Sequence, residues 1–189
     1  MANVDATSGL SPVCYLNGAP YNGQANQFDV LVGDSAIIQI GDPVKLGGTS
    51  LTGRPTATLA AAGNAFVGVC VGVVPTNRDS KIYREASVAQ TIFVADDPQI
   101  LFEIQEDSVT SIIQKAQIGL NFTLITAAGS TFTGMSGWEL DSNTGATTNT
   151  LDVQLVRAPD KPDNELEASF ARWLVKLNNH QYVDGTTGV

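Results

Sequence analysis

Residues 96–107 read Asp-Asp-Pro-Gln-Ile-Leu-Phe-Glu-Ile-Gln-Glu-Asp. Pro98 lacks an amide hydrogen and follows two acidic residues, so it marks the beginning of a β-strand and does not interrupt one. Beyond it, Ile100, Phe102 and Ile104 alternate with other side chains and therefore share one face of an extended chain. This stretch predicts a strand with an apolar face turned toward a core.

The same two-residue alternation recurs in both directions from this stretch. Upstream, residues 66–74 alternate valine with glycine and Cys70, which predicts a strand whose glycine face lies close to other backbone, with Cys70 as a small core residue. Downstream, residues 171–177 place Trp173 on one face with three aliphatic side chains. These segments predict further half-buried strands.

Turn residues separate the strand candidates. The chain has eighteen glycines and eight prolines distributed along its length. Gly33-Asp34, for example, lies between apolar runs at 28–32 and 36–40 and favours a hairpin there. About ten short strands at this spacing predict an all-β fold, with a single β-sandwich or β-barrel-like body.

Two parts of the chain depart from the strand pattern. Residues 108–116 form the best candidate for a short helix, because Ser108 can cap it and apolar residues follow at helical spacing. Residues 1–27 are small, polar and rich in turn residues, with little apolar surface to order them unaided. We therefore expect an extended N-terminal arm over 1–27 and a β-rich body over 28–189 that ends in a polar C-terminal tail.

The composition restricts what the protein can bind. Charged residues are 15% of the chain, below the roughly 25% that is usual for soluble domains, so uncharged polar side chains or bound partners must cover much of its surface. Nineteen acidic residues against ten basic ones give a net charge of −9, and the basic residues form no stripe along the sequence. Because binding to phosphates requires clustered lysine or arginine, no nucleic-acid partner is predicted.

Cysteine usage and hydropathy bear on the cellular compartment. Cys14 and Cys70 are too few for the disulfide framework of a small secreted domain, and a bond between them is not expected. No apolar run approaches transmembrane length, and residues 2–12 lack the apolar centre of a signal peptide. We expect a protein made in the cytosol, with no membrane partner.

The residue types used in catalysis and metal binding are scarce. His180 is the only histidine, and without a Gly-x-Ser-x-Gly elbow to supply a nucleophile it is expected to be exposed or to lie at an interface. One histidine and two distant cysteines do not form a tetrahedral zinc set. Residues 141–145 begin like a calcium loop but lack its closing glutamate. The sequence therefore predicts that the protein is not an enzyme and has no catalytic, cofactor-binding or metal-binding residues.

Three blocks of sequence carry a resemblance to a known family. They are residues 96–107, Trp173-Leu-Val-Lys-Leu-Asn-Asn-His-Gln-Tyr182 and Leu16-Asn-Gly-Ala-Pro-Tyr-Asn-Gly-Gln24. Together they resemble the capsid cement or decoration proteins of tailed bacteriophages, which bind the outside of the icosahedral head and reinforce it. The blocks include both ends and the middle of the chain, so the resemblance extends over all of it.

The resemblance implies partners and a place of action. It implies a structural protein that binds the major capsid protein and also itself, as a homo-oligomer, with a trimer favoured over a dimer. It implies synthesis in the cytoplasm of a host bacterium and a final location on the outer capsid surface of the virion. The alternative is a carbohydrate-binding or adhesin-like β module, which would need a face lined with aromatic side chains.

The candidate contacts with the capsid or with other subunits lie near the two ends of the chain. The N-terminal ones combine turn residues with tyrosine anchors, and the C-terminal ones form an uncharged polar cluster suited to hydrogen bonds at a wet interface. They are Tyr15, Asn17, Pro20, Tyr21, Asn22, Gln24, Trp173, Asn178, Asn179, His180 and Tyr182.

Overall fold

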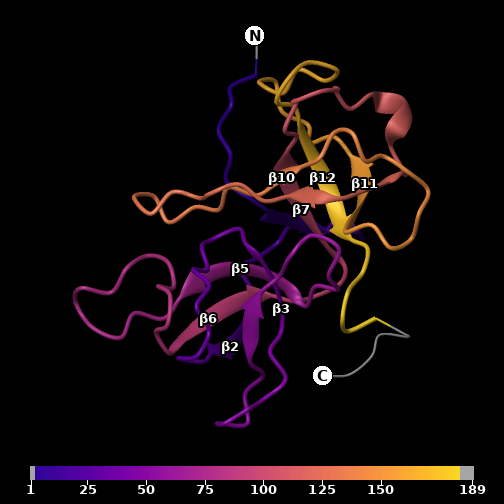
Figure 1. Ribbon diagram of the computed structural model, residues 1–189. Coiled ribbons are helices and arrows are strands. Elements are labelled where there is room, and N and C mark those ends of the chain that lie inside the picture. Colours follow the sequence, from indigo (N-terminus) through magenta and orange to yellow (C-terminus); the bar gives the residue numbers. More distant parts are fainter. Residues whose placement is uncertain (1–2, 184–189) are drawn as a thin grey trace.

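The structure is a computed structural model that describes residues 3–183, and within them the fold is all-β (Figure 1). Twelve short strands and one 3₁₀ turn, without an α-helix, make up the regular structure of these residues. The elements are β1 (Ser11–Tyr15), β2 (Asn26–Val30), β3 (Pro43–Leu46), β4 (Ala57–Leu59), β5 (Gly68–Val73), β6 (Gln90–Ala95), β7 (Ile100–Gln105), η1 (Lys115–Gln117), β8 (Asn121–Phe122), β9 (Leu124–Ile125), β10 (Glu139–Leu140), β11 (Val153–Arg157) and β12 (Arg172–Leu177).

The first sheet has the antiparallel order β1-β7-β12-β11-β8, and the short pair β9 and β10 forms a two-stranded sheet of its own. Strand β7 lies within the stretch 96–107, and its Ile100, Phe102 and Ile104 all enter one hydrophobic core. Trp173 of β12 is opposite Ile104 and enters the same core. The alternation in the sequence therefore predicted the buried face of both central strands correctly.

The second sheet has the antiparallel order β2-β6-β5-β3-β4 and curves back on itself. Its outer strand β2 approaches the beginning of β4 from the other side, where the amide of Asp29 donates to the carbonyl of Pro55 (3.0 Å) and Asp29 forms a parallel bridge with Thr56. Phe28, Ile92 and seven other buried residues form the core inside this curve. This half of the molecule is thus barrel-like.

Strand β5 connects the two cores. Val69 belongs to the core of the first sheet, and the next residue, Cys70, points into the core of the second. Gly68 begins the same strand. A Cβ placed on it would lie 2.4 Å from the carbonyl oxygen of Ala95 on the neighbouring strand β6, so only glycine fits there. The expected close approach at the glycine face is confirmed, as is the buried position of Cys70. With two five-stranded antiparallel sheets, the molecule is sandwich-like, as the sequence predicted.

The opposite face of β7 is covered as well, although its side chains are mostly polar. Glu103 accepts hydrogen bonds from Lys161 (2.7 Å) and also lies 3.3 Å from a guanidinium nitrogen of Arg172. Gln105 donates to the backbone carbonyls of Val4 (2.7 Å) and Phe170 (3.0 Å). The N-terminal segment and the connector before β12 therefore lie over a face that periodicity alone would leave in solvent.

The N-terminal segment differs from the separate arm that we expected. Residues 11–15 are extended, but they form strand β1 and pair with β7 at the edge of the first sheet. Leu10 is fully buried in the main core, and the amide of Ala6 donates to the side chain of Gln105 (3.0 Å). Within the described residues this segment belongs to the body, because pairing with β7 satisfies its backbone groups.

The short helix expected over 108–116 is wrong, and only the 3₁₀ turn η1 forms at its end. Ser108 has a φ of 51°, in the left-handed region that cannot begin a helix. The buried carboxylate of Glu106 accepts hydrogen bonds from the Ser108 hydroxyl (3.1 Å) and the Ile113 amide (3.1 Å). These side-chain bonds replace the backbone bonds that a helix would make.

The hairpin expected at Gly33-Asp34 is also absent from the described residues. Strand β2 pairs with β6, and residues 36–40 make only isolated bridges, including one between Ile38 and Arg84. A long-range pairing has therefore replaced the local one.

Candidate functional site

The three sequence blocks lie close together in space around Asp96, at the junction between β6 and β7. The side-chain amide of Asn26 donates to both carboxylate oxygens of Asp96 (2.9 and 3.1 Å). Burial raises the pKa of Tyr21, and Tyr15 and Asp96 act in the same direction. Burial also raises the pKa of Tyr182, with a further contribution from Asp96. Tyr21 and Tyr182, from segments far apart in the sequence, are therefore within electrostatic reach of one carboxylate.

The N-terminal part of this site is a hydrogen-bonded loop that follows β1. The hydroxyl of Tyr21 donates to the carbonyl of Gln24 (2.7 Å), and the Tyr15 and Tyr21 rings lie 6.3 Å apart. Asn17 accepts a hydrogen bond from the amide of Ala19 (3.0 Å), which closes the turn. The loop is thus held in one shape by its own contacts.

A hollow of about 340 Å³ opens between this loop and the β6–β7 junction. Its walls combine one phenol ring with amide and carboxylate groups, and neither aspartate has an ion-pair partner among the described residues. The lining residues are Tyr15, Gln24, Ala25, Asn26, Asp96 and Asp97. This arrangement suits a ligand or partner group that donates hydrogen bonds.

His180 is buried, which corrects the expectation that it is exposed or lies at an interface. Only 1% of its surface is accessible, and its Nδ1 atom accepts a hydrogen bond from the amide of Tyr182 (3.1 Å). Burial lowers the pKa of His180 despite the nearby charges of Asp96 and Asp97. The buried, neutral ring is therefore not placed for proton transfer with an external substrate.

Most of the C-terminal candidates make contacts within the chain. Trp173 is fully buried, and its indole nitrogen donates to Glu106 (3.1 Å), so it cannot touch a partner. Asn178 donates to two backbone carbonyls of the loop before β11, and the carbonyl of Asn179 accepts the amide of Phe66 (2.8 Å). These residues connect the two halves of the fold.

The candidates that remain at the surface are mostly those of the N-terminal loop. They are Tyr15 and Tyr21, which are half-buried, and Asn17, Pro20, Asn22, Gln24 and Tyr182, which are exposed.

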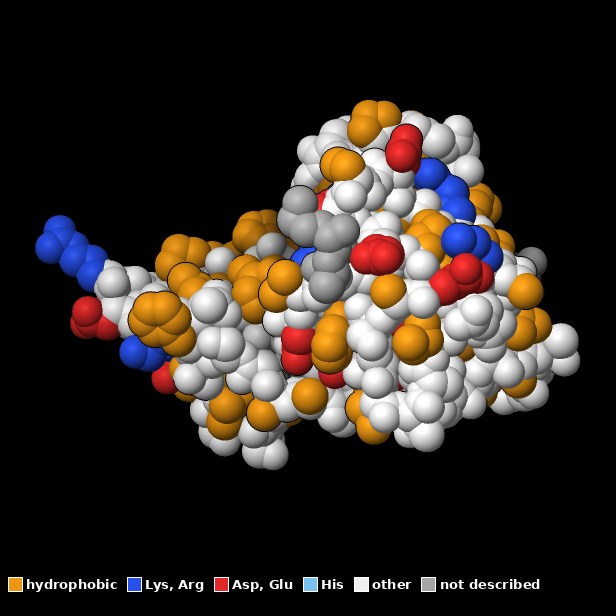
Figure 2. All heavy atoms as spheres, turned by 90° about the horizontal axis from the view of Figure 1, so that it is seen from above, with side chains coloured by type: hydrophobic (Ala, Val, Ile, Leu, Met, Phe, Trp, Pro, Cys, Tyr) orange, Lys and Arg blue, Asp and Glu red, His pale blue; other side chains and the backbone are white. Residues whose placement is uncertain are grey.

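Two long loops, to which sequence reasoning assigned no functional role, project from the same side of the molecule (Figure 1). The Phe132 loop (residues 126–137) precedes β10, and the Arg78 loop (residues 75–89) connects β5 to β6. Phe132 is 92% exposed, and Arg78 and Lys81 are exposed on the second loop. Figure 2 shows hydrophobic side chains on the projecting part of the molecule, with both basic and acidic side chains at its end. No periodicity marks such positions, because their exposure is set by how the loops fold.

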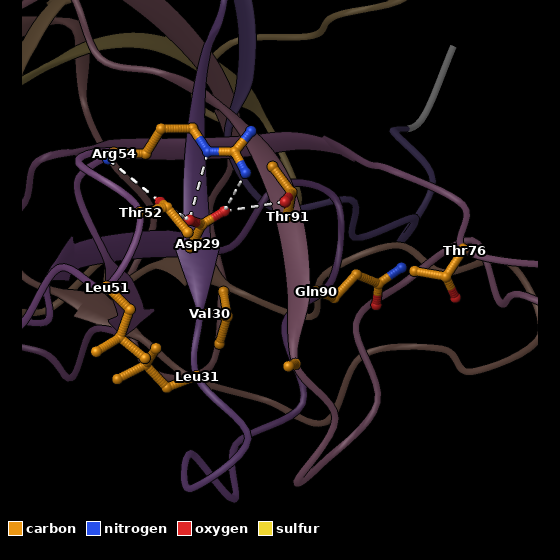
Figure 3. A pocket seen from close by; sticks show the side chains of 10 residues that line it. Asp29, Val30, Leu31, Leu51, Thr52, Arg54, Thr76, Gln90 and Thr91 are labelled. Carbon is orange, nitrogen blue, oxygen red and sulfur yellow. Dashed lines mark hydrogen bonds and ion pairs between the residues drawn. The ribbon is translucent and has the colours of Figure 1, made fainter.

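A second hollow, of about 290 Å³, lies beside β2 near the base of the Arg78 loop (Figure 3). At its polar end Asp29 accepts the Thr91 hydroxyl (3.0 Å) and pairs with Arg54 (3.3 Å). A hydrogen bond from Thr52, together with those from Thr91 and Arg54, lowers the pKa of Asp29 against the opposing effect of burial. The apolar end is lined by Val30, Leu31, Leu51 and Ala89.

The described residues contain no group of three or more histidine, cysteine, aspartate or glutamate side chains placed to hold a metal ion. Cys14 and Cys70 are both buried free thiols, and burial raises the pKa of Cys70 to about 12. A search of residues 3–183 found no helix long and apolar enough to cross a membrane.

Comparisons with known proteins found no relative. No family model matches the chain, and neither a curated protein nor a solved structure is significantly similar to it.

Proposed function

We propose that the protein is a structural accessory protein of a phage capsid, a cement or decoration protein. In this proposal it binds the outer surface of the head and stabilises contacts between major capsid proteins. It acts as a homo-oligomer, with a trimer favoured over a dimer, and has no enzymatic activity. The partners, the location on the virion and the synthesis in a bacterial host come from the resemblance of its three sequence blocks to that family.

One observation carries the proposal: large apolar side chains stand exposed on loops that project from a compact β body. Phe132 is 92% exposed and Leu51 is 77% exposed. Large apolar side chains that stand exposed on loops are stabilised when a partner protein covers them, so these positions favour a role in protein–protein contact. The scarcity of charged residues agrees with a surface that other proteins cover in part.

The hollow beside Asp96 is the second contact surface in this proposal. Asp96 and Asp97 present carboxylates without basic partners among the described residues, and Tyr15 provides an apolar wall. A lysine or arginine side chain of the capsid subunit would find a charge partner and an aromatic face there. Each such contact contributes only a modest binding free energy, but icosahedral symmetry repeats it across the shell. Capsid subunits can then separate only after these contacts are broken.

Co-sedimentation with purified empty heads of the same virus tests the proposal. We expect the protein to bind at a fixed, saturable ratio. Asp97→Lys should weaken binding, and Asp160→Lys provides a control with the same charge change at an exposed position outside the hollow. Absence of saturable binding by the unmodified protein would refute the capsid role. Equal binding by the two variants would show that the Asp96 hollow is not part of the contact surface.

The hollow also favours the alternative of a carbohydrate-binding module. Sugar hydroxyls are recognised by amide and carboxylate groups beside an aromatic ring, and Tyr15, Asn26 and Asp96 provide that combination. A glycan array with the free protein distinguishes the two functions: specific glycan binding that is lost in Tyr15→Ala, without binding to heads, would favour the module.

A further inference from the structure

We propose that Asn22 is a site of spontaneous deamidation, where asparagine converts to aspartate and isoaspartate without an enzyme. The chain contains two Asn-Gly pairs, Asn17-Gly18 and Asn22-Gly23, both in the loop that follows β1. Glycine has no Cβ, so its backbone nitrogen can approach the side chain of the preceding asparagine closely. The hydrogen bonds of the two pairs differ, and this difference assigns the reaction to Asn22.

The reaction needs only groups of the chain and water. The backbone nitrogen of Gly23 attacks the Cγ atom of Asn22, and a new C–N bond forms. The Cγ–Nδ2 bond breaks, and the side-chain nitrogen leaves as ammonia with the proton that Gly23 loses. Water then opens the succinimide ring at either carbonyl, which yields aspartate or isoaspartate. Asparagine is among the thermolabile residues of proteins, and no oxidant or reductant is required here.

The reacting groups of Asn17 and Gly18 are held by hydrogen bonds. The Gly18 amide, which would be the nucleophile, donates to the carbonyl of Tyr15 (2.9 Å). The Oδ1 atom of Asn17 accepts a hydrogen bond from the Ala19 amide (3.0 Å). Attack would require both bonds to break, because the nitrogen must lose its proton and the side chain must turn toward it. This pair is therefore protected in the folded protein.

The reacting groups of Asn22 and Gly23 are free of such bonds. Within residues 3–183, neither the side chain of Asn22 nor the amide of Gly23 forms a hydrogen bond. Both residues are exposed, and a Cβ placed on Gly23 would meet no atom within 4 Å. Gly18 has equally open surroundings, so hydrogen bonding and not space distinguishes the two pairs.

Deamidation at Asn22 would change both the charge and the backbone of this loop. The Tyr21 hydroxyl donates to the carbonyl of Gln24 (2.7 Å), so this bond spans Asn22 and Gly23. Isoaspartate adds a methylene group to the backbone within that span, and either product makes the net charge of −9 more negative. Because Gln24 lines the hollow beside Asp96, the change affects a wall of that hollow. The inference goes beyond the proposed function and does not depend on it.

Peptide mapping by mass spectrometry tests this site. The folded protein is incubated in mildly alkaline buffer, and the peptides with Asn17 and Asn22 are followed over time. We expect deamidation at Asn22 to be faster by roughly tenfold, the factor that corresponds to the net free energy of one to two hydrogen bonds. In urea, which removes the folded structure, the two rates should become similar. Equal rates in the folded protein, or no reaction at Asn22, would overturn the inference, and so would a difference that persists in urea.

Matched variants identify the modified residue in the intact protein. Asn17→Gln and Asn22→Gln both keep a side-chain amide at an exposed position, but glutamine does not form the succinimide ring. Deamidation adds a negative charge, so aged protein should yield a later peak in anion-exchange chromatography. Asn17→Gln should yield this peak at the rate of the unmodified protein, and Asn22→Gln should lose most of it. Circular dichroism should show unchanged folding of both variants. A peak that persists in Asn22→Gln and is lost in Asn17→Gln would refute the assignment.

Discussion

At the scale of single residues, the most consequential side chains are buried charges that hold loops. The Arg84 guanidinium is fully buried and donates to the carbonyls of Val88 (2.9 Å), Leu31 (2.9 Å), Asp34 (2.8 Å) and Ala36. One planar group with five donors thus satisfies carbonyls from two loops of the second half of the molecule.

Replacing Arg84 with methionine should destabilise the protein strongly. The methionine preserves the apolar stem but leaves four carbonyls without their donor, and unsatisfied buried groups typically cost about 1–3 kcal/mol each before relaxation. We expect a decrease of roughly 2–4 kcal/mol in the free energy of unfolding, measured by urea denaturation. Arg78→Met, at an exposed position, is the control; an equal effect of the two substitutions would contradict the role of Arg84.

Glu139 should make stability depend on pH. Burial, with help from Asp5 and Asp107, raises its pKa from 4.5 to about 7. A raised pKa in the folded state means that Glu139 stabilises the protein below about pH 4.5, and that this contribution is lost as the pH rises through 7. The melting temperature of Glu139→Gln minus that of the unmodified protein should therefore be larger at pH 8 than at pH 4. The same difference at both pH values would show that Glu139 titrates normally.

At the scale of elements, hydrophobic alternation predicted the central strands, and buried polar groups determined where it failed. Ile100, Phe102 and Ile104 were assigned to the core correctly because side chains two residues apart on a strand share a face, and these three make that face apolar. The segment 108–116 failed because Glu106 accepts its hydrogen bonds, and that carboxylate is buried by residues distant in sequence. Periodicity contains no information about such a partner.

The segment after β12 should be needed for folding. From the sequence, the polar cluster at 178–182 was expected to serve only association, but its Asn179 carbonyl accepts the Phe66 amide (2.8 Å) and Gln181 accepts the Leu46 amide (2.8 Å). Truncation after Leu177 should lower the melting temperature in circular dichroism, because these bonds tie the last strand to the second sheet. Asn22→Ala, in the exposed part of the N-terminal loop, is the control, and a truncated protein that melts like the control would refute this assignment.

At the scale of the whole molecule, the two cores should unfold together. Strand β5 contributes Val69 to one core and Cys70 to the other, and Asp152 beside β11 accepts the amides of Gly63 (2.8 Å) and Leu124 (2.8 Å). We expect a single calorimetric transition whose van't Hoff enthalpy equals its calorimetric enthalpy. Two resolved transitions would show that the halves are independent, and Asp152→Ala should then affect only one of them.

The candidate site was only partly predictable from the sequence, because burial at the site depends on contacts between segments that are distant in the chain. The sequence indicated Tyr15, Tyr21 and Gln24 through turn chemistry and aromatic anchors, and these do line or support the hollow beside Asp96. It placed Trp173 on the apolar face of its strand but also among the candidate contacts, and it expected His180 to be exposed or at an interface. Both side chains are buried, because the sequence of a strand end does not show whether another segment covers it. It did not find Phe132, because a single aromatic residue in a polar loop has no pattern.

The sequence by itself determined the all-β class and the buried faces of the main strands, since these follow from local alternation and turn residues. Only the tertiary structure decided that residues 11–15 join the first sheet, that β2 pairs with β6, and that Asn26 and Tyr182 both approach Asp96. Those outcomes depend on contacts between residues far apart in the chain. Such contacts form when buried backbone groups must find partners, and local sequence does not specify which partner is nearest.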